Sequence, residues 1–423
     1  MKHMISRYRG FAGLVSSNLL NNIVTFLTVI VLSKLITPEE FGVFTLCVSI
    51  MMTCASILDF GTNLSFVRWY NLKGESVDRE SLFGAAILIQ LCTTTGLLFF
   101  LFPLSLLLKI YLMKQVGTSS DIFYAMLAAG VFNWWTLIRA IRQAQQNHQR
   151  YSFVTVLFSI IRMAVLPCCY LLDMVSPTSI LVGLYLVAPL AIVLFEGFTE
   201  LTKIKHIRPL SHESRSMAKR FIVYGKWSFA SSVLFPIVSS VPVWVLAHLN
   251  YYSAVGAYGV GLSFANAMAP LRDAIRVYMF PKIVGFSSKQ MAIDMLAKLK
   301  GKFIYIPLIA LSASLLTVFA QKLIHGHRYE HVHIVIILMI STQVITMYTN
   351  IIGNLLHYLG KPYVHPITNI FCVTLSLALS ALLVPDYGVV GAAMAASLSI
   401  LSGEYIIYRY LSRQLFITES SCF

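Results

Sequence analysis

The feature that most constrains this chain is a succession of long apolar segments that carry almost no charge. A helix needs about 20 mostly apolar residues to cross a hydrocarbon core of ~30 Å. Marking such runs between charged residues and Gly or Pro predicts twelve spans, which cover residues 12–36, 41–66, 82–108, 122–138, 152–172, 180–201, 222–247, 253–280, 303–320, 332–356, 363–384 and 388–408.

The composition excludes a soluble chain. Apolar residues make up 57% of the sequence and charged residues 12%, against roughly 45–50% and about 25% in soluble proteins. So few charges cannot cover the surface of a soluble globule. We therefore predict an all-α polytopic membrane protein. Six of the seven cysteines lie inside apolar runs, so no disulfide framework or metal-binding Cys pair is expected.

The distribution of positive charge predicts the orientation. If the N-terminus is cytoplasmic, 26 of the 32 Lys and Arg residues lie in inside segments and five lie outside. This bias follows the positive-inside rule and places both termini in the cytoplasm. Anionic lipid accounts for the net charge of +15, so we expect no nucleic-acid partner. The longest inside connection, 202–221, predicts a cytoplasmic linker between six-helix lobes at 1–201 and 222–423.

The two halves resemble each other. Leu32–Leu35 followed by Gly42 has the spacing of Leu246–Leu249 followed by Gly256, and Gly183 with Glu196 has the spacing of Gly391 with Glu404. Each half has an even number of predicted spans, so the repeat is parallel, related by an axis along the membrane normal. Such a duplication is typical of transporters that handle substrate between two halves.

Four spans carry stripes of polar residues at helical spacing. Polar side chains within a membrane face a wet cavity or form interhelical hydrogen bonds, and both interpretations stay open for these stripes. Because the stripes occupy matching positions in both halves, we expect spans 1, 2, 7 and 8 to line a cleft. The stripe residues are Asn18, Asn21, Asn22, Thr25 and Thr28; Ser49, Thr53, Ser56, Asp59 and Asn63; Ser228, Ser231, Ser232 and Ser239; and Ser263, Asn266, Asp273 and Arg276.

Charged residues inside the spans are candidates for function. Arg162 lies in mid-span, at a cost of at least ~2.5–3.5 kcal/mol, so it needs either an anionic head group or a buried acid such as Asp59. Arg276, Arg272 and Arg68 lie near cytoplasmic span ends, where each either guides an anion inward or anchors its helix.

The acidic residues suggest two roles. Asp59 and Asp273 lie on the polar stripes and are candidates for carrying a coupling H⁺ or Na⁺. We expect the repeat mates Glu196 and Glu404 to form salt bridges with nearby Arg or Lys.

Two shorter motifs have a local interpretation. Thr37, Pro38 and Glu40 predict an N-cap with a capping box at the start of the second span. The segment His325–His333 contains four histidines on an outside loop, for which we favour a pH-sensitive loop over a metal site.

The sequence contains no nucleophile elbow, P-loop, HExxH or dinucleotide-binding motif. We therefore expect no enzymatic activity and no cofactor. Since no ATP-binding domain is apparent, transport would draw on an ion gradient, the membrane potential or the substrate's own gradient.

Several segments together resemble the O-antigen (Wzx-type) polysaccharide flippases of the multidrug/oligosaccharidyl-lipid/polysaccharide (MOP) exporter superfamily. The resemblance extends over nearly the whole chain, and its order and spacing are more specific than any single motif. It rests on LSKLITPEEFGVF at Leu32–Phe44, ILDFG at Ile57–Gly61, Val67–Arg68, Gln143–Arg150, Gly326–Tyr329, Gly360–Pro362 and Pro385–Ala393.

The resemblance implies a MATE-like fold of two six-helix lobes in the bacterial inner membrane. It also implies alternating-access flipping of an undecaprenyl-pyrophosphate-linked oligosaccharide repeat unit from the cytoplasmic to the periplasmic leaflet, with a cationic cavity for the pyrophosphate. Lipopolysaccharide (O-antigen) biosynthesis and contact with the glycan polymerase and assembly machinery belong to the same expectation. The family has no single fixed motif, so the substrate-binding candidates Arg162, Arg276, Arg68, Asn18, Asn21, Asn22 and Asn266 come from the physical argument above.

Two other functions fit parts of this pattern. An ion-coupled drug or cation exporter of the same superfamily would need an acidic, aromatic pocket, whereas the polar stripes here are of mixed charge and lean basic. A membrane-embedded glycan polymerase or ligase would need catalytic groups on a sizeable outside loop, and the predicted outside connections are short, about 109–121 and 321–331 at the longest.

Overall fold

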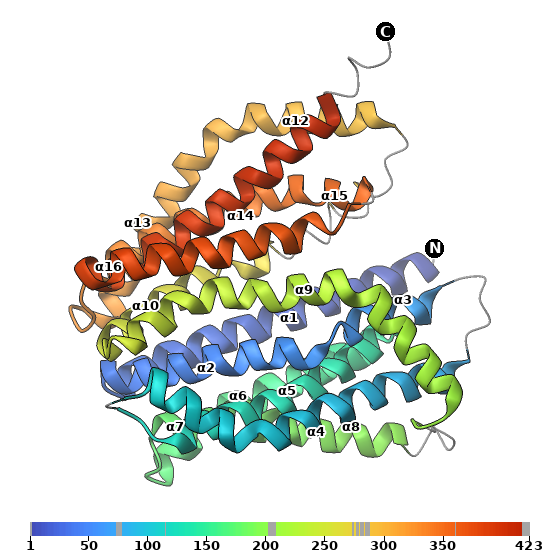
Figure 1. Cartoon of the computed structure of the whole chain (residues 1–423), viewed down its shortest axis with the longest axis horizontal. Helices are drawn as coiled ribbons and strands as arrows, with labels where there is room; N and C mark the ends of the chain where they lie inside the picture. The colour runs from blue at the N-terminus through green and yellow to red at the C-terminus, as the bar shows by residue number, and fades with distance from the viewer. Residues whose placement is uncertain are drawn as a thin grey trace. The chain divides into compact units, whose positions relative to one another are not determined.

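The computed structural model describes residues 2–72, 78–114, 116–201, 209–272, 275, 279, 283, 288–359 and 361–416. Every regular element in these ranges is a helix (Figure 1). Among the described helices, ten are long and apolar enough to cross a membrane. The chain is therefore an all-helical, multi-pass membrane protein, as its apolar runs predict. The number of twelve spans, the two lobes and the cytoplasmic termini stay predictions.

The difference between ten and twelve has a local origin. Helix α16 (Val364–Phe416) covers the last two predicted spans and has one non-helical residue inside it, Gly388, with φ 52° and ψ −126°. Helix α10 (Tyr252–Asn266), in the eighth predicted span, has only 15 residues. Of the rest of that predicted span, the structure describes residues 267–272, 275 and 279, and Asp273 and Arg276 are among those that it does not describe.

The chain forms two compact units, Met1–Pro236 and Ile237–Phe423. The first contains α1 (Lys2–Leu35), α2 (Pro38–Asp59), α3 (Thr62–Asn71), α4 (Arg79–Leu112), α5 (Ser119–Ala144), α6 (His148–Leu171), α7 (Pro177–Leu181), the π-helical η1 (Val182–Val187) and α8 (Ala188–Leu201). The chain enters the second unit within α9 (His212–His248).

Helix α5 is the centre of the first unit. It packs against α2, α3, α4, α6, η1 and α8, while α1 packs mainly against α6. Small buried residues on α5, among them Ala125, Ala129 and Gly130, let neighbouring helices approach closely.

The start of α2 confirms the predicted capping box. Thr37 Oγ1 accepts the Glu40 amide at 3.2 Å, and Glu40 Oε2 accepts the Thr37 amide at 2.8 Å. Pro38 is the first helical residue, where its missing N–H costs nothing.

The second predicted span, 41–66, is broken in the structure. Phe60 (φ 47°) and Gly61 (φ 74°) adopt the left-handed conformation and separate α2 from α3. Asp59 Oδ1 accepts the amide of Asn63 at 3.3 Å, in the first turn of α3. The carboxylate therefore helps to begin α3, in addition to lying at the end of the polar stripe on α2.

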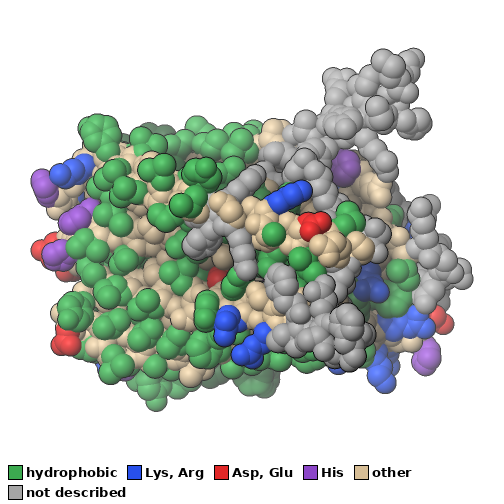
Figure 2. All heavy atoms as spheres, turned by 90° about the horizontal axis from the view of Figure 1, so that it is seen from above, with side chains coloured by type: hydrophobic (Ala, Val, Ile, Leu, Met, Phe, Trp, Pro, Cys, Tyr) green, Lys and Arg blue, Asp and Glu red, His purple; other side chains and the backbone are tan. Residues whose placement is uncertain are grey.

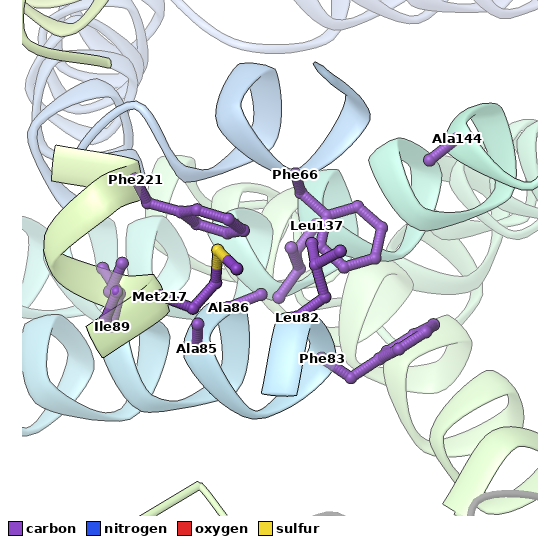
Figure 3. Packing of buried hydrophobic residues seen from close by; sticks show 11 residues of the cluster. Phe66, Leu82, Phe83, Ala85, Ala86, Ile89, Leu137, Ala144, Met217 and Phe221 are labelled. Carbon is purple, nitrogen blue, oxygen red and sulfur yellow. The ribbon is translucent and has the colours of Figure 1, made fainter. Parts of the chain in front are cut away.

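The first part of α9 belongs to the core of the first unit. Met217, Ala218 and Phe221 are buried against α3, α4 and α5 (Figure 3). Residues 212–221, which the sequence predicts as linker, are thus helical because one face of this segment is apolar; residues 202–208 lie outside the described part of the chain. The linker and the two domain boundaries stay predictions.

The second unit is organised around α14 (Val332–Gly353), which packs against α10, α13 (Ile306–His325) and α16. The shorter elements are α12 (Lys289–Lys302), the 3₁₀ turn η2 (Phe303–Tyr305) and α15 (Leu355–Tyr358). Helices α5 and α14, which contain the fourth predicted span of each half, are each central within their own unit.

Large apolar side chains are exposed in both units, including Phe99, Phe102, Leu316 and Phe319, each more than 60% exposed. Hydrophobic side chains also dominate much of the face in Figure 2. Such exposure would promote aggregation in water but is expected of helices that face lipid.

A glycine pair allows α9 to approach the α2–α3 junction. A Cβ atom on Gly225 would lie 2.9 Å from Ser65 Oγ and 3.2 Å from the Gly61 carbonyl oxygen. We therefore expect Gly225→Ala to lower the free energy of unfolding by about 1–3 kcal/mol through overpacking. The matched control is Gly96→Ala on α4, which has nothing within 4 Å of the added methyl and should be neutral or slightly stabilising. Thermal unfolding in detergent measures both, and equal midpoints would contradict the packing argument.

Candidate functional site

The polar stripe of α1 packs against α6 and forms hydrogen bonds along its length. Asn21 Oδ1 accepts from Ser159 Oγ at 3.2 Å, and Thr25 Oγ1 accepts from Arg162 Nη1 at 2.8 Å. Nearer the N-terminus, Ser17 Oγ lies 3.4 Å from Ser152 Oγ. We call this row, with Asn18 and its partners described below, the α1–α6 seam.

Arg162 is the least compensated charge of the seam. Its side chain is 3% exposed, and its Nε and Nη2 atoms have no hydrogen-bond partner in the described part of the chain. The guanidinium carbon lies 5.3 Å from the ring centre of Phe158 and 4.9 Å from that of Tyr185. No acid among the described residues forms an ion pair with Arg162, so the predicted alternative of pairing with Asp59 is not found.

The surroundings of Arg162 favour a cation, but two of its three side-chain nitrogens form no hydrogen bond to the described residues. Aromatic faces attract a guanidinium by about 2 kcal/mol or more when the pair is desolvated. That attraction satisfies no N–H group, and an unpaired buried donor costs roughly 1–3 kcal/mol, more when it is charged. Tyr185 lies on η1, a π-helical segment of the kind that often marks functional sites.

Arg139 on α5 also contacts the seam, nearer to the N-terminus of α6 than Arg162 lies. Its Nη2 donates to Asn18 Oδ1 at 2.9 Å and to the Tyr151 hydroxyl. The Tyr151 hydroxyl donates to the same Asn18 oxygen at 3.3 Å. Arg139 also lies over the ring of Trp135, at 4.7 Å. From the sequence, Arg139 is predicted only as a positive-inside charge, and the one signal for its contact is the aromatic residue four positions earlier, Trp135.

The other predicted residues are dispersed. Asn22 is half-buried on α1 without a hydrogen bond to the described residues, whereas Asn63 Nδ2 donates to Thr136 Oγ1 at 3.3 Å. Arg68 is exposed on α3, 3.9 Å from the ring centre of Tyr224. Asn266 is exposed at the end of α10, in the second unit. The cleft among spans 1, 2, 7 and 8 stays a prediction.

The expected salt bridge of Glu196 is present and involves two arginines. Arg142 donates through Nε to Glu196 Oε2 at 3.0 Å and through Nη2 to the same oxygen. Arg150 Nη2 lies 2.6 Å from Oε1. This cluster, the Glu196 network, joins α5, α6 and α8. Its repeat mate Glu404 differs, since it forms no ion pair with the described residues.

The histidine-rich loop does not form a metal site in this structure. Residues 325–333 are all described, and no group of three His, Cys, Asp or Glu residues in the described chain is arranged to hold a metal ion. The imidazoles of His331 and His333 lie 6.5 Å apart, measured between ring centres.

The fold and the seam define a helical membrane protein whose first unit contains two arginines, the buried Arg162 and the half-buried Arg139, in a polar helix–helix contact. The family described as "Polysaccharide biosynthesis protein" matches residues 8–281, well over half of the sequence. The chain belongs to this family.

Individual relatives match part of the chain. The putative O-antigen transporter of Escherichia coli K12 is 25% identical over 272 residues, 62% of this chain and 61% of the relative. The probable low-salt glycan biosynthesis flippase Agl15 of Haloferax volcanii is 24% identical over 207 residues, 48% of this chain and 44% of the relative. The matched segments thus span about half of these relatives.

Solved structures share the fold at low sequence identity. An inward-facing multidrug resistance MATE family transporter of the MOP superfamily has a TM-score of 0.73 at 14% identity, over 95% of this chain and 96% of that one. The lipid II flippase MurJ, in an inward closed conformation, has a TM-score of 0.61 at 13% identity, over 97% and 93%. These likenesses show that the chain has the fold of MOP transporters.

The Glu196 network gives a stability prediction. Glu196→Gln removes the carboxylate and leaves the buried Arg142 guanidinium uncompensated, so we expect a loss of about 3–5 kcal/mol in the free energy of unfolding. Glu39→Gln, at an exposed acid in the first turn of α2, is the matched control. It should lower the free energy of unfolding by only a few tenths of the loss expected for Glu196→Gln. Thermal unfolding in detergent compares the two; similar midpoints would mean that the network is not structural.

Proposed function

We propose that the protein is a flippase that moves an undecaprenyl-pyrophosphate-linked oligosaccharide repeat unit from the cytoplasmic to the periplasmic leaflet of a bacterial inner membrane. The observation that carries this proposal is the Arg162 side chain, buried and unpaired at two nitrogens. A planar guanidinium with two free donors suits a phosphate group, because it can bond two oxygens at once.

The rest of the seam suits the sugar. A lipid-linked glycan keeps its tail in the bilayer, so the protein needs only a polar path for the sugar and cations for the phosphates. Within the first unit, the α1–α6 seam holds amide and hydroxyl groups next to Arg139 and Arg162. Helix α1 packs mainly against α6 and much less against α2. A shift of α1 away from α6 would therefore expose the polar groups of the seam to the substrate at the same time.

Alternating access between two halves is the mechanism that we propose, driven by an ion gradient or the membrane potential. The MOP fold supports such a mechanism. Asp59 is our candidate for the coupling residue for H⁺ or Na⁺, because it is a carboxylate at the junction of α2 and α3, a break that can change geometry. Asp273 is proposed for the same role, and Arg68, Arg276, Asn22 and Asn266 for contact with substrate.

A drug or cation exporter is the second candidate, favoured by the similarity to the MATE transporter. The seam argues against it, because Arg139 and Arg162 would repel a cationic drug.

Contact with the glycan polymerase and assembly machinery is part of the first proposal, that of a flippase.

Leaflet-specific labelling in a deletion strain separates these functions. Lipid-linked repeat units should accumulate and stay inaccessible to a membrane-impermeant glycan label in spheroplasts. Labelled but unpolymerised units would mean that the protein acts after translocation, as a polymerase or ligase would. Unchanged glycan together with altered drug resistance would favour the exporter.

The variant Arg162→Gln should insert normally but lose most transport when expressed at low level in this strain, since an amide keeps hydrogen bonding and removes the charge. Arg215→Gln, at an exposed arginine of α9, is the control and should restore wild-type labelling. Normal surface glycan with Arg162→Gln at wild-type protein level would remove Arg162 from the substrate path.

Asp59→Asn should change the dependence of transport on the ion gradient, because the amide cannot bind H⁺ or Na⁺ as a carboxylate does. The measurement is glycan labelling in vesicles with an imposed proton or sodium gradient. Asp294→Asn on α12, at an acid outside the predicted spans, is the control. An unchanged gradient dependence would exclude Asp59 as the coupling residue.

A further inference from the structure

Helix α9 is too long to lie wholly within the hydrocarbon layer. At a rise of about 1.5 Å per residue its 37 residues extend about 55 Å, whereas the hydrocarbon core is ~30 Å thick. Residues 227–248 contain no Asp, Glu, Lys or Arg and are by themselves long enough to cross the core. The turns before them therefore lie where the helix leaves the hydrocarbon. We call residues 219–227 the interfacial segment of α9.

One face of the interfacial segment is fixed against the first unit. Ala218, Phe221 and Gly225 recur at helical spacing and are buried. Phe221 packs into the core formed with α3, α4 and α5 (Figure 3). Its carbonyl oxygen accepts the Ser65 hydroxyl at 3.0 Å, and Gly225 adjoins the α2–α3 junction. These contacts decide which side chains of the segment point outward.

The outward side of the segment combines positive charge with exposed apolar side chains. Six exposed residues form two adjacent rows at helical spacing, which are Lys219, Ile222 and Lys226 in one row and Arg220, Val223 and Trp227 in the other. The side chain of Val223 is 61% exposed, and that of Trp227 is 43% exposed. Each row thus places an aliphatic residue between a basic residue and a second basic or aromatic one.

The positive charge of the two rows is not neutralised by the protein around it. Among the described residues, neither Lys219 nor Lys226 forms an ion pair with an acid. Lys226 Nζ lies 5.4 Å from the ring centre of Trp227, and the Arg220 guanidinium lies 5.8 Å from the ring centre of Trp69 on α3. Aromatic faces attract a cation without cancelling its charge. The surface is therefore complementary to an anion.

We propose that the interfacial segment of α9 is a docking surface for the headgroups of anionic phospholipids. Its basic side chains would meet the phosphodiesters, its aliphatic side chains would enter the boundary of the acyl chains, and Trp227 has the interfacial position that tryptophan prefers. A soluble acidic partner would match the charges but would not explain apolar side chains at the edge of the hydrocarbon.

This docking surface is more specific than the positive-inside bias. That bias sets the orientation of the whole chain by the number of charges, whereas the segment would select lipid charge at one place in the fold. The chain also passes from the first unit to the second within α9, so bound lipid would hold the start of this helix against the first unit. The surface does not depend on which substrate the protein transports.

Binding of short-chain lipids to the purified full chain in an uncharged detergent tests the proposal, with native mass spectrometry as the measurement. We expect phosphatidylglycerol to be retained in preference to phosphatidylcholine. The double variant Lys219→Gln with Lys226→Gln should weaken phosphatidylglycerol binding about tenfold or more, because two headgroup contacts lose their charge. Retention of phosphatidylcholine should not change. The double variant Lys219→Arg with Lys226→Arg keeps the charge and should bind as the wild type does.

The matched control is Lys114→Gln with Lys322→Gln, at two exposed lysines outside the segment, and it should bind phosphatidylglycerol as the wild type does. In nanodiscs, brominated phosphatidylcholine should quench the tryptophan fluorescence of the wild type more than that of Trp227→Phe. Four results would overturn the proposal. These are equal retention of both lipids by the wild type, equal phosphatidylglycerol affinities for the two Lys→Gln double variants, equal quenching with and without Trp227, and displacement of phosphatidylglycerol by inorganic pyrophosphate, which would indicate a phosphate site instead of a membrane surface.

Discussion

The absence of water in the hydrocarbon layer is the constraint on which this structure depends. Every backbone N–H and C=O group there needs a partner from the protein, which restricts the spanning elements of this chain to helices. The same lack of water makes each intramembrane charge expensive, so the few charged side chains inside the helices require an explanation. The first unit contains two groups of them, and they are stabilised in opposite ways.

In the Glu196 network, opposite charges compensate one another. The carboxylate pairs with both Arg142 and Arg150, so these ion pairs hold three elements together, and the Arg150 side chain is partly exposed. Arg162, in contrast, has aromatic rings and one hydroxyl around it, but no acid among the described residues. Burial without compensation costs stability, and proteins keep such groups at sites of function. Because the hydrogen bonds of Asn18 and Asn21 extend the same row, the α1–α6 seam is the part of the first unit on which our proposal for substrate binding rests.

The two units each have a central helix, but these helices differ in their basic residues. Helices α5 and α14 are each central in their unit, as the predicted duplication would require. Arg139 and Arg142 on α5 have no counterpart on α14, which contains no Lys or Arg, and the part of α16 before Gly388 contains none either. The two units therefore differ in the basic residues of their central helices, and Arg139 and Arg162 both belong to the first unit.

The sequence by itself determined the class of protein, because long apolar runs and sparse charge leave only membrane helices. It also determined local features set by neighbouring residues: the capping box at Thr37, the polar face of α1 and the presence of an arginine in mid-span. Only the tertiary structure decided which helix meets that polar face. Helical periodicity places Asn21 and Thr25 on one side of α1, but contact with Ser159 and Arg162 depends on packing between segments more than 130 residues apart. The same reason explains why Arg139 was missed, why α2 ends at a left-handed Phe60–Gly61 pair beside Gly225, and why residues 212–221 are helical, since each depends on a partner distant in the chain.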